Sequence, residues 1–175
     1  DLTRSRGLGD VYKRQPPSDG VEWNDGGLEG TKRFLNKFWE NIEKLTKLEV
    51  VESSDNENSI VRKVNQSINS VSKHLDKFEF NTAVSDLMKL NNELSDFLKY
   101  SQEISKSSRD MIIKNISILL FPMAPHIASE IYENYFGEDL INITWPQVDN
   151  ENLKDPTYEL VIPVSYTHLR AHETE

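Results

Sequence analysis

Cysteine is absent from all 175 residues of this chain. The protein therefore has no disulfide bond and no thiolate metal ligand, which suits a reducing compartment, so we expect a cytoplasmic protein. Apolar runs long enough to span a bilayer are absent as well, and no membrane segment is predicted. Basic residues are in deficit, because 20 lysines and arginines stand against 29 aspartates and glutamates, for a net charge of -9. That balance argues against a generally basic nucleic-acid binder, although it is compatible with a local basic stripe.

The signatures of catalysis and of cofactor binding are missing too. No glycine-rich phosphate loop follows a strand, and neither a Ser-His-Asp set nor a metal-spaced pair of histidines is present. Between residues 16 and 162 the histidines are His74 and His126. We expect His74 to be a solvated side chain and His126, which follows Pro125, to pack against or cap a helix start. No catalytic residue, cofactor site or metal site is therefore predicted for this chain.

The two ends of the chain differ from the sequence between them, and they are related to each other. Codons for residues 5–15, SRGLGDVYKRQ, can be chosen so that their reverse complement, read from its third base, encodes VSYTHLRAHE, which is residues 164–173. One DNA segment read in both directions thus accounts for both ends, and it resembles a transposon-type sequencing adapter. We expect residues 1–15 and 163–175 to be adapter-derived, non-native tails outside the fold. The native sequence is expected to continue beyond residues 16–162 on both sides.

Five segments repeat their apolar residues every three or four positions, which is the spacing of one face of an α-helix. We expect helices at about residues 28–48, 58–76, 80–100, 108–121 and 125–136, joined by polar linkers. The fourth segment, MIIKNISILLF, is apolar almost all round, so we expect it at the centre, with Ile116 and Leu120 as core positions. The predicted fold class is all-α, an antiparallel bundle of about five helices with irregular N- and C-terminal connectors.

Three stretches together resemble the bacterial-type leucyl-tRNA synthetases, a family of class I. Residues 16–39, PPSDGVEWNDGGLEGTKRFLNKFW, are similar to the passage that follows the family's Lys-Met-Ser-Lys-Ser region. Residues 61–94 resemble its next two helices, including the FNTA turn. Residues 119–137, together with Thr-Trp-Pro at 144–146, resemble its Ala-Pro-His-Ile-Ala helix and its Trp-Pro. The first stretch argues for leucine, whereas the third is shared with the valine, isoleucine and methionine enzymes.

The resemblance implies a domain organisation and a role. Residues 16–27 would connect to a preceding catalytic domain, residues 28–146 would form the helical anticodon-binding-type domain, and residues 147–162 would lead to a C-terminal domain. In this family the bundle braces the body of tRNA(Leu), while ATP and Mg²⁺ serve aminoacylation elsewhere in the enzyme. The family's ATP-binding motifs do not occur here, so the fragment is expected to hold no cofactor and to be non-catalytic alone. The implied partners are tRNA(Leu) and the enzyme's own catalytic and C-terminal domains, without a membrane.

Two alternatives stay open at this point. The segment could be the same domain of a valyl-, isoleucyl- or methionyl-tRNA synthetase, because those enzymes share the third stretch. It could also be a stand-alone helical scaffold that binds protein, which would need none of the missing motifs.

Candidate tRNA-binding residues are cations that the helical period puts on faces away from the apolar stripe. Phosphate binding needs such a local set and not a positive total charge. The candidates are Arg33 and Lys37 on the first predicted helix and Arg62, Lys63, Lys73 and Lys77 on or just beyond the second. Gln66 and Asn69 fall between the latter as neutral hydrogen-bonding groups. The competing interpretation is an ordinary solvated helix face.

Overall fold

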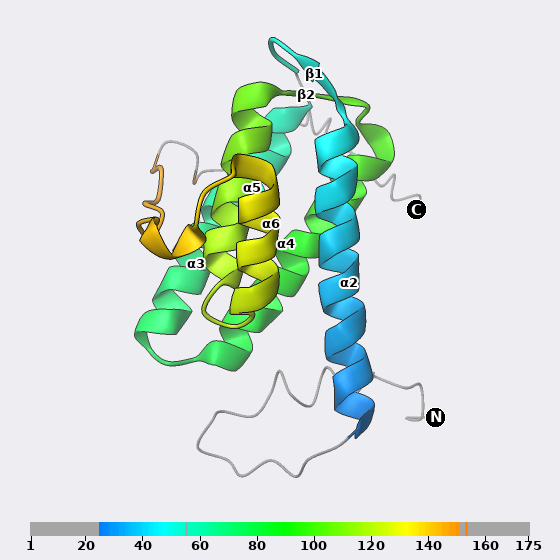
Figure 1. The fold of residues 1–175 in the computed structure, drawn as a ribbon. Helices are drawn as coiled ribbons and strands as arrows, with labels where there is room; N and C mark the ends of the chain where they lie inside the picture. Colours follow the sequence, from blue (N-terminus) through cyan, green and yellow to red (C-terminus); the bar gives the residue numbers. More distant parts are fainter. Residues whose placement is uncertain (1–24, 55, 151–152, 154–175) are drawn as a thin grey trace, which may run out of the picture.

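The computed structural model describes residues 25–54, 56–150 and 153, and within them the chain is a helical bundle (Figure 1). Its helices are α2 (Asp25–Lys47), α3 (Glu57–Asp76), α4 (Phe80–Tyr100), α5 (Lys106–Leu120) and α6 (Pro125–Phe136), followed by a short 3₁₀ helix, η1 (Leu140–Asn142). The prediction of an all-α bundle of about five helices is confirmed. Helix α2 begins earlier than expected, because the apolar pattern starts only at Leu28 whereas the helix starts at Asp25. The predicted tails lie outside the described residues, and the predicted domain boundaries stay predictions.

Successive helices run in opposite directions, so the bundle has two ends (Figure 1). The end drawn at the bottom, which we call the lower end, holds the start of α2, the α3–α4 turn and the α5–α6 connection. At the opposite end, the upper end, α2 is joined to α3 and α4 is joined to α5. Helix α5 contacts α2, α3 and α6, while α4 packs on α2 and α3. The chain therefore enters the described bundle at its lower end.

Helix α5 forms the centre of the core, as its apolar sequence predicts. Its side chains Ile112, Ile113, Ile116, Leu119 and Leu120 are at most 1% exposed. They belong to one buried cluster that also contains apolar residues from α2, α3, α4 and α6. The prediction that Ile116 and Leu120 are central core positions is thus confirmed.

The upper end carries a two-stranded parallel sheet where the sequence predicted only polar linkers. Strand β1 (Glu49–Val51) pairs with β2 (Glu103–Ser105), and Glu49 lies opposite Glu103. Strand β2 leads directly into α5, whose N-cap is Ser105. Glu57, buried in the first turn of α3, accepts hydrogen bonds from the Ser105 amide and from its hydroxyl, each at 2.7 Å. This carboxylate therefore ties the start of α3 to the start of α5.

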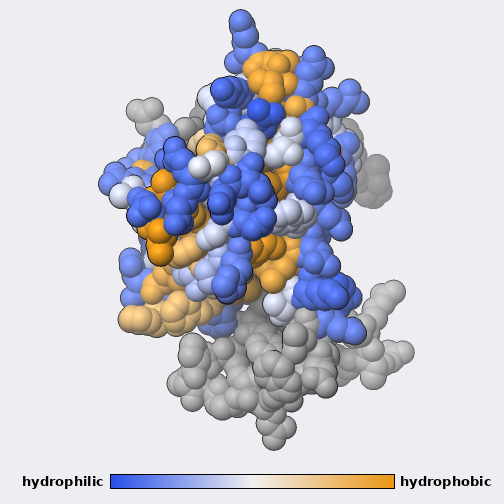
Figure 2. Space-filling model, in the orientation of Figure 1, coloured by the Kyte–Doolittle hydropathy of each residue, from blue (hydrophilic) through white to orange (hydrophobic). Residues whose placement is uncertain are grey.

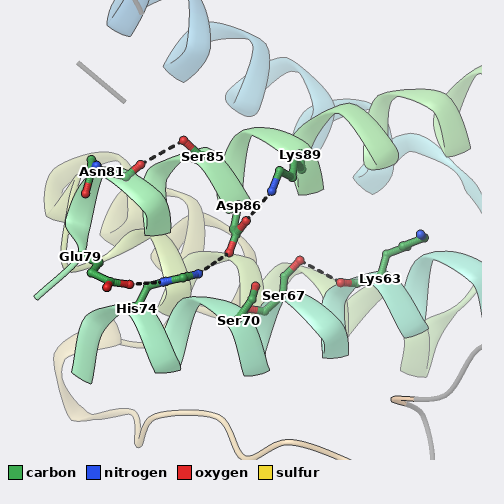
Figure 3. A network of polar contacts seen from close by, with 9 residues as sticks. All are labelled: Lys63, Ser67, Ser70, His74, Glu79, Asn81, Ser85, Asp86 and Lys89. Atoms are coloured by element: carbon green, nitrogen blue, oxygen red, sulfur yellow. Dashed lines mark hydrogen bonds and ion pairs between the residues drawn. The ribbon is translucent and has the colours of Figure 1, made fainter. Parts of the chain in front are cut away.

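The α3–α4 turn at the lower end is held by backbone and side-chain hydrogen bonds. The Glu79 amide donates to the His74 carbonyl (2.8 Å) and the Phe78 amide to the Leu75 carbonyl (3.0 Å), which ends α3 in a Schellman motif. The His74 ring lies between two carboxylates, with Nδ1 2.7 Å from Glu79 and Nε2 3.4 Å from Asp86 (Figure 3). The expectation that His74 is merely solvated is therefore wrong, since this side chain joins α3 to α4.

The histidine at the start of α6 also differs from its expectation. His126 is exposed, and it follows Pro125, which occupies the first turn of the helix, where a missing N–H leaves no hydrogen bond unmade.

Within the described residues no helix has both the length and the apolar character that crossing a membrane requires. Nor do those residues contain a cluster of three or more side chains suited to hold a metal ion.

Candidate nucleic-acid interface

The outer face of α3 carries three of the predicted cations. Arg62, Lys73 and Lys77, here named the cationic line, lie about half a turn around the helix from its buried stripe. Lys73 is in the last turn of α3 and Lys77 is its C-cap residue, and both are exposed. Neither makes an ion pair with another described residue. Both ammonium groups are therefore available to an external anion.

Arg62, the member of the cationic line nearest the upper end, is half-buried. Its Nε atom is enclosed and has no hydrogen-bond partner among the residues that the structure describes. A buried donor without an acceptor is unfavourable, on the order of 1–3 kcal/mol. A hydrogen-bond acceptor that reached this guanidinium would therefore gain more binding free energy than an acceptor that reached an already solvated group.

The segment that follows η1 runs along one flank of the cationic line. The indole N–H of Trp145 donates to a serine hydroxyl of α3 at 2.8 Å. The Asn65 side chain pairs with the backbone of Asp149 through two hydrogen bonds, one in each direction. The Gln66 amide donates to the Leu153 carbonyl at 3.4 Å. Gln66, expected to be one of the neutral hydrogen-bonding groups between the cations, thus contacts the chain's own C-terminal segment.

Two further candidates contact side chains of α4, although both remain accessible to solvent. The Lys37 ammonium donates to Asn92 Oδ1 at 3.0 Å. The Lys63 ammonium lies 4.0 Å from Glu93 Oε1, and these side chains are 39% and 50% exposed. An exposed ion pair of this kind contributes about 0–1 kcal/mol, but the carboxylate still offsets the lysine charge. Arg33, in contrast, is exposed on α2 and has no ion pair within the described part of the chain.

A groove between α2 and α4 contains two cations outside the six candidates. Lys44 and Lys99 line it together with Lys37. The Lys99 ammonium donates to Asp96 at 2.6 Å, and this hydrogen bond and its charge lower the pKa of Asp96. Because Asp96 and Glu40 also line the groove, its charge is mixed, and we do not assign it to phosphate. Helical spacing places Lys44 on the same face of the first helix as Lys37, but it does not show that Lys99 of α4 lies across from them.

Both ends of the bundle carry exposed charges of both signs, with Lys47 and Lys106 exposed at the upper end. Arg33, Lys73 and Lys77 are exposed cations toward the lower end, where Asp76, next to Lys77 in the sequence, is an exposed carboxylate. At the upper end, Glu49 and Glu103 are paired across the sheet and both are exposed. The structure separates the six candidates into three groups: Arg33, Lys73 and Lys77 have no ion pair among the described residues, Lys37 and Lys63 have partners on α4, and Arg62 is half-buried.

Comparison with known proteins assigns the bundle to a class. Residues 57–170 match the family model described as the anticodon-binding domain of tRNA ligase. This match covers more than half of the chain, and the fold is the helical bundle expected for it. The chain belongs to the family of anticodon-binding domains of tRNA ligases.

Within that class, the relatives are leucine–tRNA ligases. The enzyme of Thermosipho melanesiensis is 33% identical over 159 residues, which cover 86% of this chain and 19% of the relative. That of Crocosphaera subtropica is 38% identical over 161 residues, which cover 88% of this chain and 18% of the relative. The chain thus spans about a fifth of the length of the curated relatives it matches. The resemblance to leucyl-tRNA synthetases is confirmed, and neither the valine, isoleucine and methionine alternative nor the stand-alone scaffold is supported.

A solved structure shares the fold. The chain is similar to the LeuRS in a LeuRS–tRNA–LeuAMS ternary complex from Agrobacterium radiobacter K84, with a TM-score of 0.66 and 18% sequence identity. The similarity covers 83% of this chain and 20% of that one. At this identity the likeness establishes the arrangement of helices, and the role of individual side chains has to be argued from their own surroundings.

Proposed function

We propose that this chain is the helical domain of a leucine–tRNA ligase that braces the body of tRNA(Leu) while leucine is attached elsewhere in the longer protein. The exposed end of the cationic line carries the proposal, because Lys73 and Lys77 lie one helical turn apart without a counter-ion among the described residues. Ammonium groups spaced along one face bind phosphate oxygens and thereby position a nucleic acid without reading its sequence. The tRNA in the similar ternary complex supports a nucleic-acid partner of this kind.

The chemistry of aminoacylation belongs, in this proposal, to domains outside the chain. ATP and Mg²⁺ would bind in the catalytic domain, so the bundle would need no cofactor of its own and would have that domain and the C-terminal domain as further partners. We therefore expect the purified chain to catalyse no leucine-dependent ATP–pyrophosphate exchange. Exchange activity from this chain alone, measured with labelled pyrophosphate, would contradict the assignment.

The double substitution Lys73→Glu/Lys77→Glu is expected to weaken binding of a tRNA(Leu) transcript. Each lost phosphate contact removes one released counterion, so a plot of log K against log salt should become shallower by about one per contact. Filter retention of labelled transcript over a salt series measures both the affinity and this slope.

The matched control is Lys106→Glu/Lys114→Glu, which changes the net charge by the same amount. Both of these lysines are exposed on α5, away from the cationic line. A purely global charge effect would weaken binding equally in the two double variants. The proposal requires a larger loss from the α3 pair, and an equal or larger loss from the α5 pair would refute the placement of the interface.

A further inference from the structure

The α3–α4 turn contains a backbone conformation that its residue does not favour. Phe78 has φ +58°, and it is the non-glycine residue with positive φ in the described chain. It occupies the position after the C-cap of a Schellman motif, where glycine is the usual residue because a side chain is strained there. Its ring is 73% exposed, so burial does not compensate for that strain. The turn therefore holds an aromatic side chain out in solvent.

A second aromatic ring lies beside this side chain, and two cations precede it on α3. Phe80, 37% exposed, lies with its ring centroid 6.2 Å from that of Phe78, in an edge-to-face arrangement. Figure 2 shows the apolar surface that results at the lower left, over the α3–α4 turn. Lys77 precedes Phe78 directly, and Lys73 lies one turn earlier on α3. The aromatic pair is thus continuous with the free end of the cationic line.

The turn is also rigid, which matters for what it can bind. Two backbone hydrogen bonds fix Phe78 between α3 and α4, and the Glu79–His74–Asp86 contacts clamp the two helices around it, with Lys89 on the far side of Asp86 (Figure 3). A backbone that is already held in place loses little conformational entropy when its side chain binds a ligand. A pair of rings is too small an apolar area for a stable protein interface, but it matches the face of one nucleobase.

We propose that Phe78, supported by Phe80, is a stacking platform for an unpaired base of the RNA whose phosphates contact Lys73 and Lys77. The proposal rests on the function proposed above, and it adds a base contact to the phosphate contacts. Aromatic side chains stack on splayed-out bases in many RNA complexes, and neighbouring ammonium groups hold the backbone on either side of such a base. A blunt RNA duplex presents the same phosphates without an accessible base face at its centre.

The test compares two probes, a tRNA(Leu) transcript and a blunt RNA duplex, against two substitutions at one position. Phe78→Gly removes the ring and suits the positive φ, so this variant should melt no lower than the unsubstituted chain. It should bind the transcript about tenfold more weakly, the loss typical of one stacked base, and bind the duplex with unchanged affinity. Phe78→Trp should restore transcript binding, because indole offers a larger stacking face.

Each other outcome has a definite meaning. Unchanged transcript affinity in Phe78→Gly, with the loss in Lys73→Glu/Lys77→Glu intact, overturns the stacking platform and leaves the tRNA-bracing function standing. If the chain binds neither the transcript nor the duplex in a salt-dependent way, both the stacking platform and the tRNA-bracing function are overturned. If Phe78→Gly loses equal affinity for the transcript and for the duplex, stacking is also contradicted, because the ring would then act on the phosphate contacts. If Phe78→Gly changes only the self-association of the chain, seen by sedimentation, the aromatic pair is a protein contact and the proposal is wrong.

Discussion

Replacing Ile116 by alanine should lower the free energy of unfolding by about 2–5 kcal/mol, the range for removing a large aliphatic side chain from a rigid core. Ile116 is 0% exposed on α5, the helix that α2, α3 and α6 surround. The loss combines the transfer of the missing methyl and methylene groups with the cavity that the packed neighbours cannot fill. Urea denaturation followed by far-ultraviolet circular dichroism measures this difference.

Lys114, two positions earlier on the same helix, supplies the control. Its side chain is exposed, so Lys114→Ala should change the free energy of unfolding by less than about 0.5 kcal/mol. A similar small change for Ile116→Ala would show that α5 is not the centre of the core. The tertiary arrangement described here would then be wrong for the protein in solution.

Glu57→Ala should destabilise the chain by about 1–3 kcal/mol at neutral pH, because the Ser105 amide is then left buried without an acceptor. Burial raises the pKa of the Glu57 carboxyl, but the hydrogen bonds from the Ser105 amide and hydroxyl outweigh it, and the pKa is lowered from its ordinary value of 4.5. A lowered folded-state pKa stabilises the fold above pH 4.5, and that contribution is lost as the pH falls through the folded value.

The pH dependence distinguishes the stabilisation by the charged Glu57 carboxylate from a loss of packing, which would not depend on pH. The difference in unfolding free energy between the unsubstituted chain and Glu57→Ala should narrow as the pH falls below 4.5, because Glu57 then becomes protonated first in the unfolded and later in the folded state. Glu52→Ala, which removes an exposed carboxylate near the same sheet, should show a small difference at every pH. A Glu57→Ala difference that stays constant from pH 7 to pH 3 would contradict the role given to the charged form.

The helices were predictable because each has a long, regular apolar period. The predicted range 80–100 coincides with α4, and the all-round apolar character of residues 111–121 correctly indicated the central helix. The pairing of β1 with β2 was not predictable, because each strand has three residues and the partners are far apart in sequence. Segments of three residues are too short to show a period, and only the folded arrangement of α2 and α4 brings them together.

The candidate interface was predictable in part. Helical periodicity placed Lys73 and Lys77 on the outer face of α3, and both are exposed there. It could not show that Lys37 contacts Asn92 or that Lys63 faces Glu93, because these partners belong to another helix whose rotation follows from packing. For the same reason the course of the C-terminal segment along α3 could not be predicted from residues 140–153 alone.

The most direct test of the proposed tRNA contact is a lysine acetylation footprint of the chain with and without the tRNA(Leu) transcript, read by mass spectrometry. Bound phosphates shield the ammonium groups they contact, so Lys73 and Lys77 should be protected at low salt and become reactive again at high salt. Lys106 and Lys114, exposed on α5, should react equally in both samples. Protection of Lys106 and Lys114 with continued reactivity of Lys73 and Lys77 would contradict the interface on α3.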